Sequence, residues 1–363
     1  MSTRVRSHSK INLGLAIGPP RADGFHHLST LYQTLALHDV VTVTATRAPA
    51  TRLSLTSNHP AVPTDQRNTA WRMVARCLKR LNLTAEVTIH IQKNLPIQGG
   101  MGAGSANAAA ALIALEHELG VALSGRERLE LAAEIGSDVP LFLLGGAVLG
   151  LGRGEEVYPF PDLPATTCVI ALPQVGVSTP QAFRDWDRLL AAIPGPDRAT
   201  NHPLTKSTAP DRLRELSLAL ASTYAEPGTS GIFCKSGFIS EGPEKKQGSS
   251  DRNQSNLQND LAENALLALV RTGIENDFEQ VVFPIHPPLR EIKRQLMGSG
   301  SGADSDSPAL CAALSGSGSA LFGLYRSNAD ARVAQQRVQA LGVKAVMTHT
   351  LPREAYWRTM FAG

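Results

Sequence analysis

The chain has 363 residues, of which 42% are hydrophobic and 18% charged, and its formal net charge is +3. This length fits two domains with ample core, and the composition is that of an ordinary globular protein. The small positive charge is too diffuse to favour a nucleic acid or a membrane surface as partner. No apolar run approaches the length of a membrane span, and residues 1–10 lack the apolar core of a signal peptide, so we expect a cytoplasmic protein.

Cysteine and histidine spacing gives no sign of a metal site. The cysteines stand far apart without any C-x-x-C pair, at Cys77, Cys168, Cys234 and Cys311. This spacing is typical of reduced thiols rather than of a disulfide framework or a zinc site. The ten histidines also lack the spacing of metal ligands.

Local patterns predict mixed strands and helices. In chain order we expect a strand at 41–46, a helix at 69–81, a strand at 87–91, helices at 106–119 and 126–134, and strands at 147–151 and 167–172. Asn68 and Ser105 precede two of these helices as candidate N-caps, and Gly136 follows the third as a stop signal.

The distribution of proline and of small polar residues predicts the domain boundary. Three prolines in residues 158–164 are typical of a linker, so we expect one domain over 1–157 and a second over 165–363. Residues 225–258 and 298–307 are rich in glycine, serine and charged residues and are typical of flexible surface insertions. We expect no catalytic role for them.

The most informative stretch is Leu95 to Ala110, with the sequence LPIQGGMGAGSANAAA. Its glycines permit positive φ and close approach of a ligand, and the helix that follows offers free N–H groups and a positive end to an anion. It lacks the Gly-Lys-Ser/Thr of a Walker A loop, and its G-x-G-x-G spacing differs from the dinucleotide fingerprint. By spacing alone, a plain strand–turn–helix corner remains the alternative.

Several ordered segments resemble the GHMP kinases. Residues 96–106 resemble the phosphate loop of that family, and residues 314–323, LSGSGSALFG, resemble its third motif, a glycine turn that closes over the loop. Residues 9–15, SKINLGL, and 21–28, RADGFHHL, resemble the opening of the branch that acts on 4-diphosphocytidyl-2-C-methyl-D-erythritol. Further matches to that branch follow in order at 134–140, 152–155, 177–183 and 276–279. The resemblance implies a two-domain α+β fold with ATP at the domain junction and the acceptor across the cleft.

The same resemblance implies an activity and a catalytic pair. The expected reaction is ATP- and Mg²⁺-dependent phosphorylation of the 2-hydroxyl of that cytidyl alcohol, a step in isoprenoid precursor synthesis. Asp138 would accept the hydroxyl proton, Lys10 would pair with Asp138 beside the transferred phosphoryl group, and Ser105 would serve phosphate or magnesium. By spacing alone, Asp138 is typical of a helix N-cap two residues before Pro140, and Lys10 of a surface lysine.

Binding residues follow from the same motif matches. The implied substrate-binding residues are Asn12, Phe25, His26, Thr179 and Phe183. The implied ATP-binding residues are Asn68, Lys93, Pro96, Ile97, Gln98, Gly99, Gly100, Met101, Gly102, Ala103, Gly104, Ser105 and Ala106, with Gly316, Ser317 and Gly318 in the third-motif loop. Two aromatic rings and a histidine could clamp and read a cytosine, whereas the alternative is that both phenylalanines are core.

The loop also departs from the family pattern. Gln98, Ala103 and Ala106 stand where other members carry glycine or serine, and alanine for glycine matters only where φ must be positive. Phe25 stands where the branch usually has tyrosine. Two other functions stay open: a related kinase for homoserine or mevalonate, and a non-catalytic nucleotide-binding paralogue. The presence of both Lys10 and Asp138 argues against the second.

Overall fold

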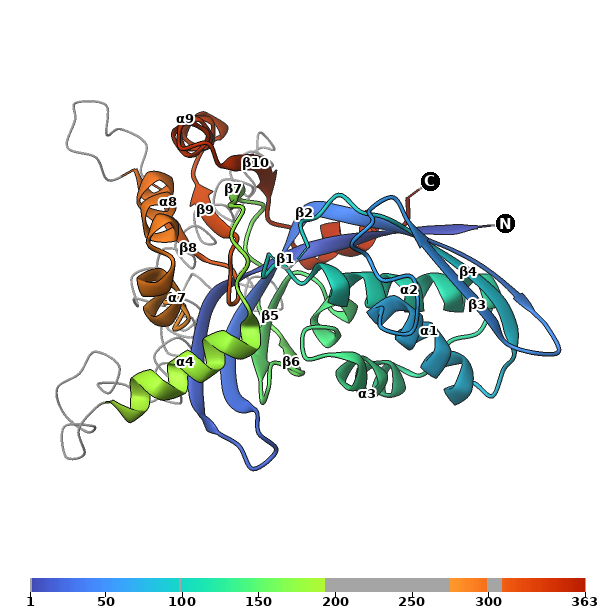
Figure 1. Cartoon of the computed structure of the whole chain (residues 1–363). Helices are drawn as coiled ribbons and strands as arrows, with labels where there is room; N and C mark the ends of the chain where they lie inside the picture. The colour runs from blue at the N-terminus through green and yellow to red at the C-terminus, as the bar shows by residue number, and fades with distance from the viewer. Residues whose placement is uncertain (1, 98, 193–274, 299–308, 363) are drawn as a thin grey trace, which may run out of the picture.

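We describe the fold from a computed structural model, in which residues 2–97, 99–192, 275–298 and 309–362 are placed (Figure 1). The expected insertion at 225–258, most of the one at 298–307, Gln98 and Cys234 lie outside the described residues. Helices mix with two largely antiparallel sheets, which confirms the α+β class.

The first sheet carries the N-terminal half of the chain. Its order is β3-β4-β2-β5-β6, with β1 paired to β2. These strands are β1 (Thr3–Pro20), β2 (His26–Arg47), β3 (Arg52–Ser57), β4 (Ala85–Gln92), β5 (Ala147–Leu151) and β6 (Glu156–Pro159). On one side of the sheet lie α1 (Thr69–Arg80), α2 (Ala103–Leu119), α3 (Gly125–Ile135) and a 3-10 helix, η1 (Pro140–Leu143). Helix α2 packs on β1 and β2, and α3 packs on α1, α2 and η1 (Figure 1). Strict alternation along β4 buries Val87, Ile89 and Ile91 in the core shared with these helices.

The second sheet has the order β10-β7-β9-β8 and is antiparallel throughout. Its strands are β7 (Thr167–Leu172), β8 (Cys311–Leu314), β9 (Leu321–Tyr325) and β10 (Lys344–His349). The helices of this part, grouped on one side in Figure 1, are α4 (Thr179–Ala191), α7 (Glu279–Ile285), α8 (Pro287–Met297) and α9 (Asn328–Ala340). Side chains from both layers, including Trp186 and Leu289, form a separate core.

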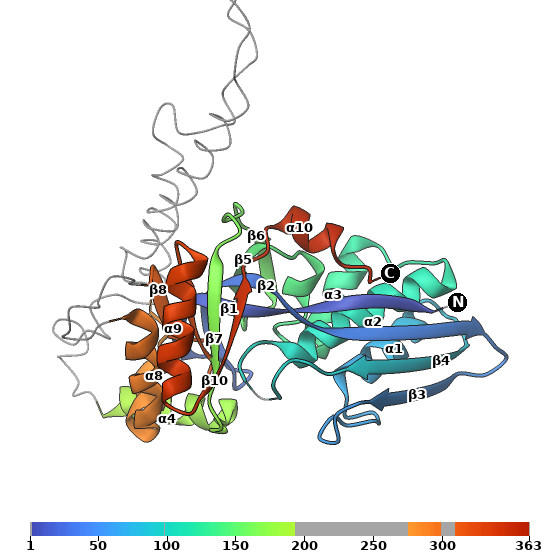
Figure 2. The same ribbon diagram turned by 90° about the horizontal axis from the view of Figure 1, so that it is seen from above.

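A long hairpin of β1 and β2 enters both halves of the molecule (Figure 2). Val5 lies in the core of the first sheet, whereas Leu15 lies in the core of the second. The pairing register shifts just before Lys10 and just after Asn12. Irregularities of this kind re-aim side chains, and here they fall at the two positions that the sequence marks as functional.

Most expected elements are confirmed, and three expectations were wrong in extent. The strand expected at 41–46 is only the end of β2, because pairing with β1 and β5 extends it far beyond its alternating stretch. Strand β6 covers the first part of the expected linker, where it pairs with β5. Helix α2 starts at Ala103, and its N-cap is Gly102 instead of Ser105. Gly102 turns the chain into the helix with φ +69°, and no side chain caps α2.

The C-terminal helix α10 (Arg353–Arg358) returns to the first sheet. The Tyr356 hydroxyl donates to the Phe142 carbonyl oxygen at 2.6 Å, and the Arg6 amide donates to the Met360 carbonyl oxygen at 2.7 Å. Both chain ends therefore lie at the same end of the molecule (Figure 1). The division at 157 and 165 remains a proposal, with the last residues packing on the first part.

A buried histidine lies where this C-terminal segment packs. His8 is 2% exposed, and neither ring nitrogen has a hydrogen-bond partner among the described residues. Its ring centroid lies 5.2 Å from those of His38 and Tyr356. Burial, with a smaller contribution from His38, lowers the pKa of His8 from 6.5 to about 4. The imidazole is therefore neutral in the folded protein near neutral pH.

We predict that His8 makes folding stability fall in mild acid. In the unfolded chain His8 binds a proton below about pH 6.5, whereas in the folded protein it does so only below about pH 4. The free energy of unfolding is therefore unaffected by His8 above pH 6.5 and decreases as the pH falls from 6.5 to 4. Between pH 7.5 and 5 this loss is about 2 kcal/mol. Urea unfolding of the wild type and His8→Gln at both pH values measures it. An equal change in both proteins would contradict the assignment.

Candidate active site

The predicted phosphate loop joins β4 to α2 and is shaped by two glycines. Gly100 and Gly102 have φ of +72° and +69°, a region that favours glycine. Ala103 begins α2 and has no positive φ, so alanine at this position brings no backbone strain. The first N–H groups of α2 have no partner within the helix, and N–H groups at a helix N-terminus commonly bind anions.

Both ends of this loop are tied to one buried carboxylate, which the sequence analysis missed. Asp39 is 0% exposed, and its Oδ1 accepts hydrogen bonds from the Asn94 and Leu95 amides, each at 2.7 Å. Its Oδ2 accepts from Lys93 Nζ at 2.5 Å and from Asn107 Nδ2, on α2, at 3.0 Å. These bonds fix where the loop leaves β4 and where α2 follows it.

The third-motif loop lies directly against the phosphate loop. Ser315 Oγ donates to the Gly100 carbonyl oxygen at 3.0 Å, and the Ala320 amide donates to the Gly99 carbonyl oxygen at 3.3 Å. A Cβ at Gly100 would collide with the Ser315 carbonyl oxygen. Asn276 holds the third-motif loop in place, because its Nδ2 donates to the carbonyl oxygens of Leu314 and Gly316. The structure therefore brings together two segments more than 200 residues apart in the sequence.

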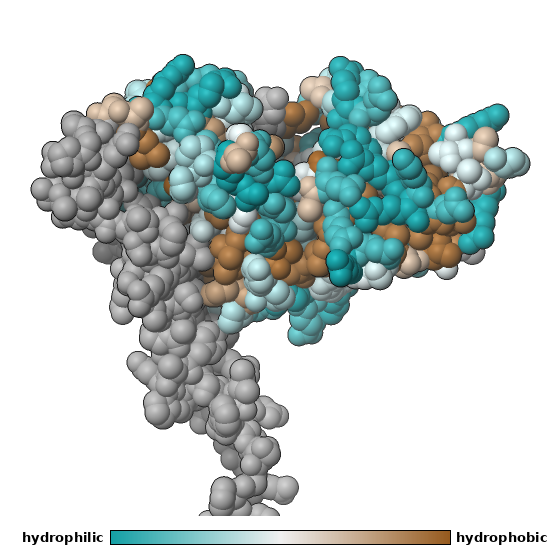
Figure 3. Space-filling view, turned by 90° about the horizontal axis from the view of Figure 1, so that it is seen from below, coloured by the Kyte–Doolittle hydropathy of each residue, from teal (hydrophilic) through white to brown (hydrophobic). Residues whose placement is uncertain are grey.

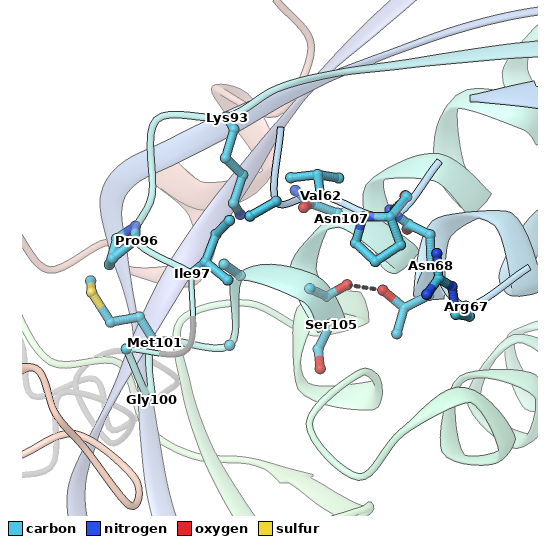
Figure 4. A pocket seen from close by; sticks show the side chains of 17 residues that line it. Val62, Arg67, Asn68, Lys93, Pro96, Ile97, Gly100, Met101, Ser105 and Asn107 are labelled. Atoms are coloured by element: carbon cyan, nitrogen blue, oxygen red, sulfur yellow. Dashed lines mark hydrogen bonds between the residues drawn. The ribbon is translucent and has the colours of Figure 1, made fainter. Parts of the chain in front are cut away.

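A pocket of about 350 Å³ opens on one side of the phosphate loop (Figure 4). Its lining includes every predicted ATP-binding residue within the described part except Ala106, which is buried in the core. In Figure 4, Pro96 and Ile97 lie on one side, Arg67 and Asn68 on the other, and Ser105 between them. The residues that the sequence analysis missed are Ala61, Val62, Pro63, Arg67, Thr69 and Asn107.

Two of the predicted nucleotide contacts are already engaged within the protein. Asn68 caps α1, since its Oδ1 accepts from the Ala70 amide at 2.9 Å while its Nδ2 donates to the Pro63 carbonyl oxygen at 2.8 Å. Lys93 is paired with Asp39. Both side chains therefore shape the pocket wall through internal bonds.

A second pocket, of about 300 Å³, lies on the other side of the phosphate loop. All the predicted catalytic and substrate-binding residues line it, together with Gly316 and Ser317. Those residues are Lys10, Asn12, Phe25, His26, Asp138, Thr179 and Phe183. Gly100 and Gly102 line both pockets. The glycine loop is thus the wall between them.

The predicted catalytic pair forms at this wall. Lys10 Nζ lies 3.4 Å from Asp138 Oδ2, and the side chain of Lys10 is 3% exposed. The ammonium also donates to Asn12 Oδ1 at 2.7 Å, and Asn12 Nδ2 donates to Thr30 Oγ1 at 2.7 Å. The alternatives from spacing alone are wrong. Lys10 is buried, and Asp138 lies in a turn before Val139, which is the N-cap of η1.

Tyr32 completes this cluster and was not found from the sequence. Its hydroxyl donates to Asp138 Oδ1 at 2.9 Å, and its ring lies 5.5 Å from Lys10 Nζ. Burial first, and then the negative charge of Asp138, raise the pKa of Tyr32 well above its usual value. The hydroxyl therefore stays protonated and holds one oxygen of Asp138, so Oδ2, the oxygen facing Lys10, remains for chemistry.

Aromatic rings and a histidine surround the far end of this pocket. His26 and Phe183 are stacked, with ring centroids 5.0 Å apart and an interplanar angle of 11°. His26 Nε2 is hydrogen-bonded to Asp187 Oδ1 at 2.8 Å, which orients the imidazole. Phe25 is 51% exposed and Phe183 is only partly buried, so neither is simply core, although Phe183 also packs on Phe278. Thr179 Oγ1 is hydrogen-bonded to Ser317 Oγ at 2.7 Å, which joins α4 to the third-motif loop.

No cluster of three or more histidine, cysteine, aspartate or glutamate side chains that could hold a metal ion occurs among the described residues. Within the same ranges, Cys77, Cys168 and Cys311 are free thiols, and burial raises the pKa of Cys77 to about 12. None of the helices in the described part is long and apolar enough to cross a membrane. Hydrophilic residues cover much of the face seen in Figure 3, with hydrophobic patches between them.

Comparison with known proteins identifies the family. The sequence matches the GHMP kinases N terminal domain over residues 68–146 and the GHMP kinases C terminal region over residues 254–344. The 4-diphosphocytidyl-2-C-methyl-D-erythritol kinase of Solibacter usitatus is 32% identical, over 96% of this chain and 96% of that protein. The chain belongs to the 4-diphosphocytidyl-2-C-methyl-D-erythritol kinases, a branch of the GHMP kinases. The same-named protein of Rhodococcus jostii is 40% identical to this kinase, over 61% of the chain and 68% of that protein.

Solved structures agree on the fold. A crystal structure of a 4-(cytidine 5'-diphospho)-2C-methyl-D-erythritol kinase has a TM-score of 0.61 and 24% identity, covering 96% of this chain and 99% of that one. The homoserine kinase of Cytophaga hutchinsonii has a TM-score of 0.62 and 18% identity, covering 97% and 95%. The predicted GHMP kinase fold is confirmed. Because both enzymes match equally well, the fold alone does not choose between their substrates.

We predict that Gly100→Ala disrupts this kinase far more than Gly120→Ala. Both glycines have positive φ, but a Cβ at Gly120 meets nothing within 4 Å, whereas one at Gly100 collides with the backbone of the third-motif loop. The control should lose about 1–2 kcal/mol of unfolding free energy from backbone strain alone. Gly100→Ala should lose on the order of 3 kcal/mol or more and most of its ATP affinity. Urea unfolding and ATP titration test both variants, and equal losses would show that the contact between the loops is unimportant.

Proposed function

We propose that this kinase transfers the γ-phosphoryl group of ATP to the 2-hydroxyl of 4-diphosphocytidyl-2-C-methyl-D-erythritol. The observation that carries the proposal is the glycine loop, which has a pocket on each side and the Lys10–Asp138 pair at the wall between them. This arrangement suits a reaction in which ATP and an alcohol meet at one phosphoryl group. The second pocket, next to Asp138, is the proposed acceptor pocket. The identity of the alcohol is supported by the names of the relatives and by the aromatic residues at one end of this pocket.

In the proposed mechanism, Asp138 accepts the proton of the 2-hydroxyl as the hydroxyl oxygen bonds to the γ-phosphorus. The bond from that phosphorus to the bridging oxygen breaks, and ADP leaves with the electron pair. The ammonium of Lys10 balances negative charge on the transferred group and pairs with Asp138 Oδ2 before transfer. Tyr32 orients the carboxylate through its hydrogen bond to Oδ1.

The nucleotide phosphates would lie on the N–H groups of the glycine loop and the first turn of α2. The magnesium ion that accompanies ATP usually needs only one or two protein oxygens. Ser105 fits this need, because it lines the nucleotide pocket and its hydroxyl makes no hydrogen bond with any described residue. Bound there, the ion would neutralise phosphate charge during transfer.

The cytosine of the acceptor would bind at the aromatic end of the second pocket. Flat apolar faces come from Phe25 and Phe183, and the oriented imidazole of His26 offers a hydrogen bond to the base edge. Thr179 and Asn12 supply further polar groups along the same wall.

The direct test is ADP release by the purified protein with magnesium and ATP, in parallel with 4-diphosphocytidyl-2-C-methyl-D-erythritol, homoserine and mevalonate. We expect turnover with the cytidyl alcohol alone and a product heavier by one phosphate. Turnover on another alcohol would retain the kinase but reject the cytosine site. ATP binding without turnover on any acceptor would indicate a non-catalytic paralogue.

We further predict that Asp138→Asn lowers kcat by about 10²–10⁴-fold, because a positioned base is lost. The Kd for ATP should stay near that of the wild type, since Asp138 lines only the acceptor pocket, and a melting curve checks that the variant is folded although the buried Lys10 has lost its carboxylate partner. Asp185→Asn makes the same chemical change on α4 outside both pockets and should keep full activity. Near-normal turnover of Asp138→Asn would refute its role as the base.

A further inference from the structure

The turn between β5 and β6 borders the acceptor pocket and has no part in the mechanism above. Gly152 and Gly154 have φ of +69° and +101°, so this turn is tightly shaped. The Leu28 amide, from β2, donates to the Gly152 carbonyl oxygen at 2.7 Å. A Cβ at Gly154 would lie 4.0 Å from Asp138 Oδ1. The turn therefore lies next to the catalytic carboxylate.

Arg153, at the centre of this turn, is held in place while its terminal nitrogens remain available. Its Nε donates to Glu155 Oε1 at 3.0 Å, and its backbone amide donates to Glu155 Oε2 at 2.6 Å. Its guanidinium carbon lies 4.9 Å from the centroid of the Phe25 ring. Neither terminal NH₂ group makes a hydrogen bond with any residue in the described ranges. The guanidinium thus presents its unused donors from a fixed position at the pocket wall.

The charge balance of the pocket leaves Arg153 as the cation for an anionic ligand. Among the described residues that line it, the lysines and arginines are Lys10 and Arg153. Lys10 already faces Asp138 and Asn12. Arg153 pairs with Glu155 through Nε and also attracts the exposed carboxylate of Asp23, while its side chain is 29% exposed.

We propose that Arg153 binds the diphosphate of the acceptor. The proposal rests on the proposed function, because in that substrate a diphosphate joins the alcohol that reacts to the cytidine. In the pocket, Arg153 lies between the parts that would bind the two ends of this substrate. Its turn lies next to Asp138, where the alcohol would react, and its guanidinium lies over the Phe25 ring, where the cytosine would bind. The planar fork of a guanidinium matches phosphate oxygens and forms strong charge-assisted hydrogen bonds. Glu155 acts as a positioning residue that holds the fork toward the pocket.

The test compares ligands that differ only in the diphosphate. Titrations with CDP and with cytidine, in saturating ADP so that the nucleotide pocket is filled, give the two affinities for each protein. Arg153→Gln should weaken CDP binding by about 10–100-fold and change cytidine binding by less than about twofold. Arg153→Lys should recover part of the CDP affinity, because it keeps the charge without the fork.

Arg80→Gln provides a matched control. Arg80 has a similar exposed fraction, 28%, and also pairs with glutamates, but it lies at the end of α1 outside both pockets. This variant should bind CDP and cytidine like the wild type. If Arg153→Gln weakens cytidine as much as CDP, the residue only supports the Phe25 ring, and the proposal is overturned.

Steady-state kinetics separate this proposal from the function on which it rests. In Arg153→Gln, the KM for the cytidyl alcohol should rise by about 10-fold or more, with the KM for ATP unchanged and kcat within a few fold. If the wild type turns over the cytidyl alcohol and Arg153→Gln has the same KM for it, the proposed role of Arg153 is overturned but the proposed function stands. A wild type without turnover on that alcohol would remove both proposals.

Discussion

The shape of the phosphate loop depends on the buried carboxylate of Asp39. A charge removed from water is costly unless its oxygens are fully hydrogen-bonded and a cation lies close. Asp39 meets this requirement with two backbone amides, Lys93 and Asn107, and these partners come from the residues just after β4 and from α2, on either side of the phosphate loop. Loss of any partner would leave a buried charge undercompensated. The geometry of the loop is thereby coupled to the stability of the first core.

A second constraint is the β1–β2 hairpin, which supplies most of the side chains hydrogen-bonded around the proposed catalytic pair. Lys10 and Asn12 lie on β1, and Thr30 and Tyr32 lie on β2, with Asn12 directly opposite Tyr32 in the register. Side chains on a paired strand are held more rigidly than side chains on a loop. Asp138 alone comes from a turn, and it is held to the hairpin by Tyr32 and Lys10.

The fold does not determine which alcohol the kinase accepts. The same two-sheet architecture is similar to a homoserine kinase as well as to a kinase of this branch. In this chain the second pocket, beside Asp138, is lined by aromatic rings, an oriented histidine and an arginine as well as by the Lys10–Asp138 pair. An acceptor with a base at one end and a hydroxyl at the other needs different residues to bind each end. Phosphoryl transfer itself needs only the glycine loop that separates the two pockets, with the groups that lie on it.

Features with local signals could be predicted from the amino-acid sequence. Alternation in β4, the cap at Asn68 and the glycine-rich loop each depend on neighbours within a few residues, and ordered motifs named the pair Lys10 and Asp138. Tertiary structure alone decided what these residues touch. Tyr32 and Asp138 are 106 residues apart, and Asp39 and Asn107 are 68 apart, so no local pattern marks either bond. Ser105 does not have its predicted capping role, because α2 begins earlier, after Gly102, which lies between Lys10 and Phe142. Hydrogen bonds and packing between distant segments set these positions, and they exist only once the chain has folded.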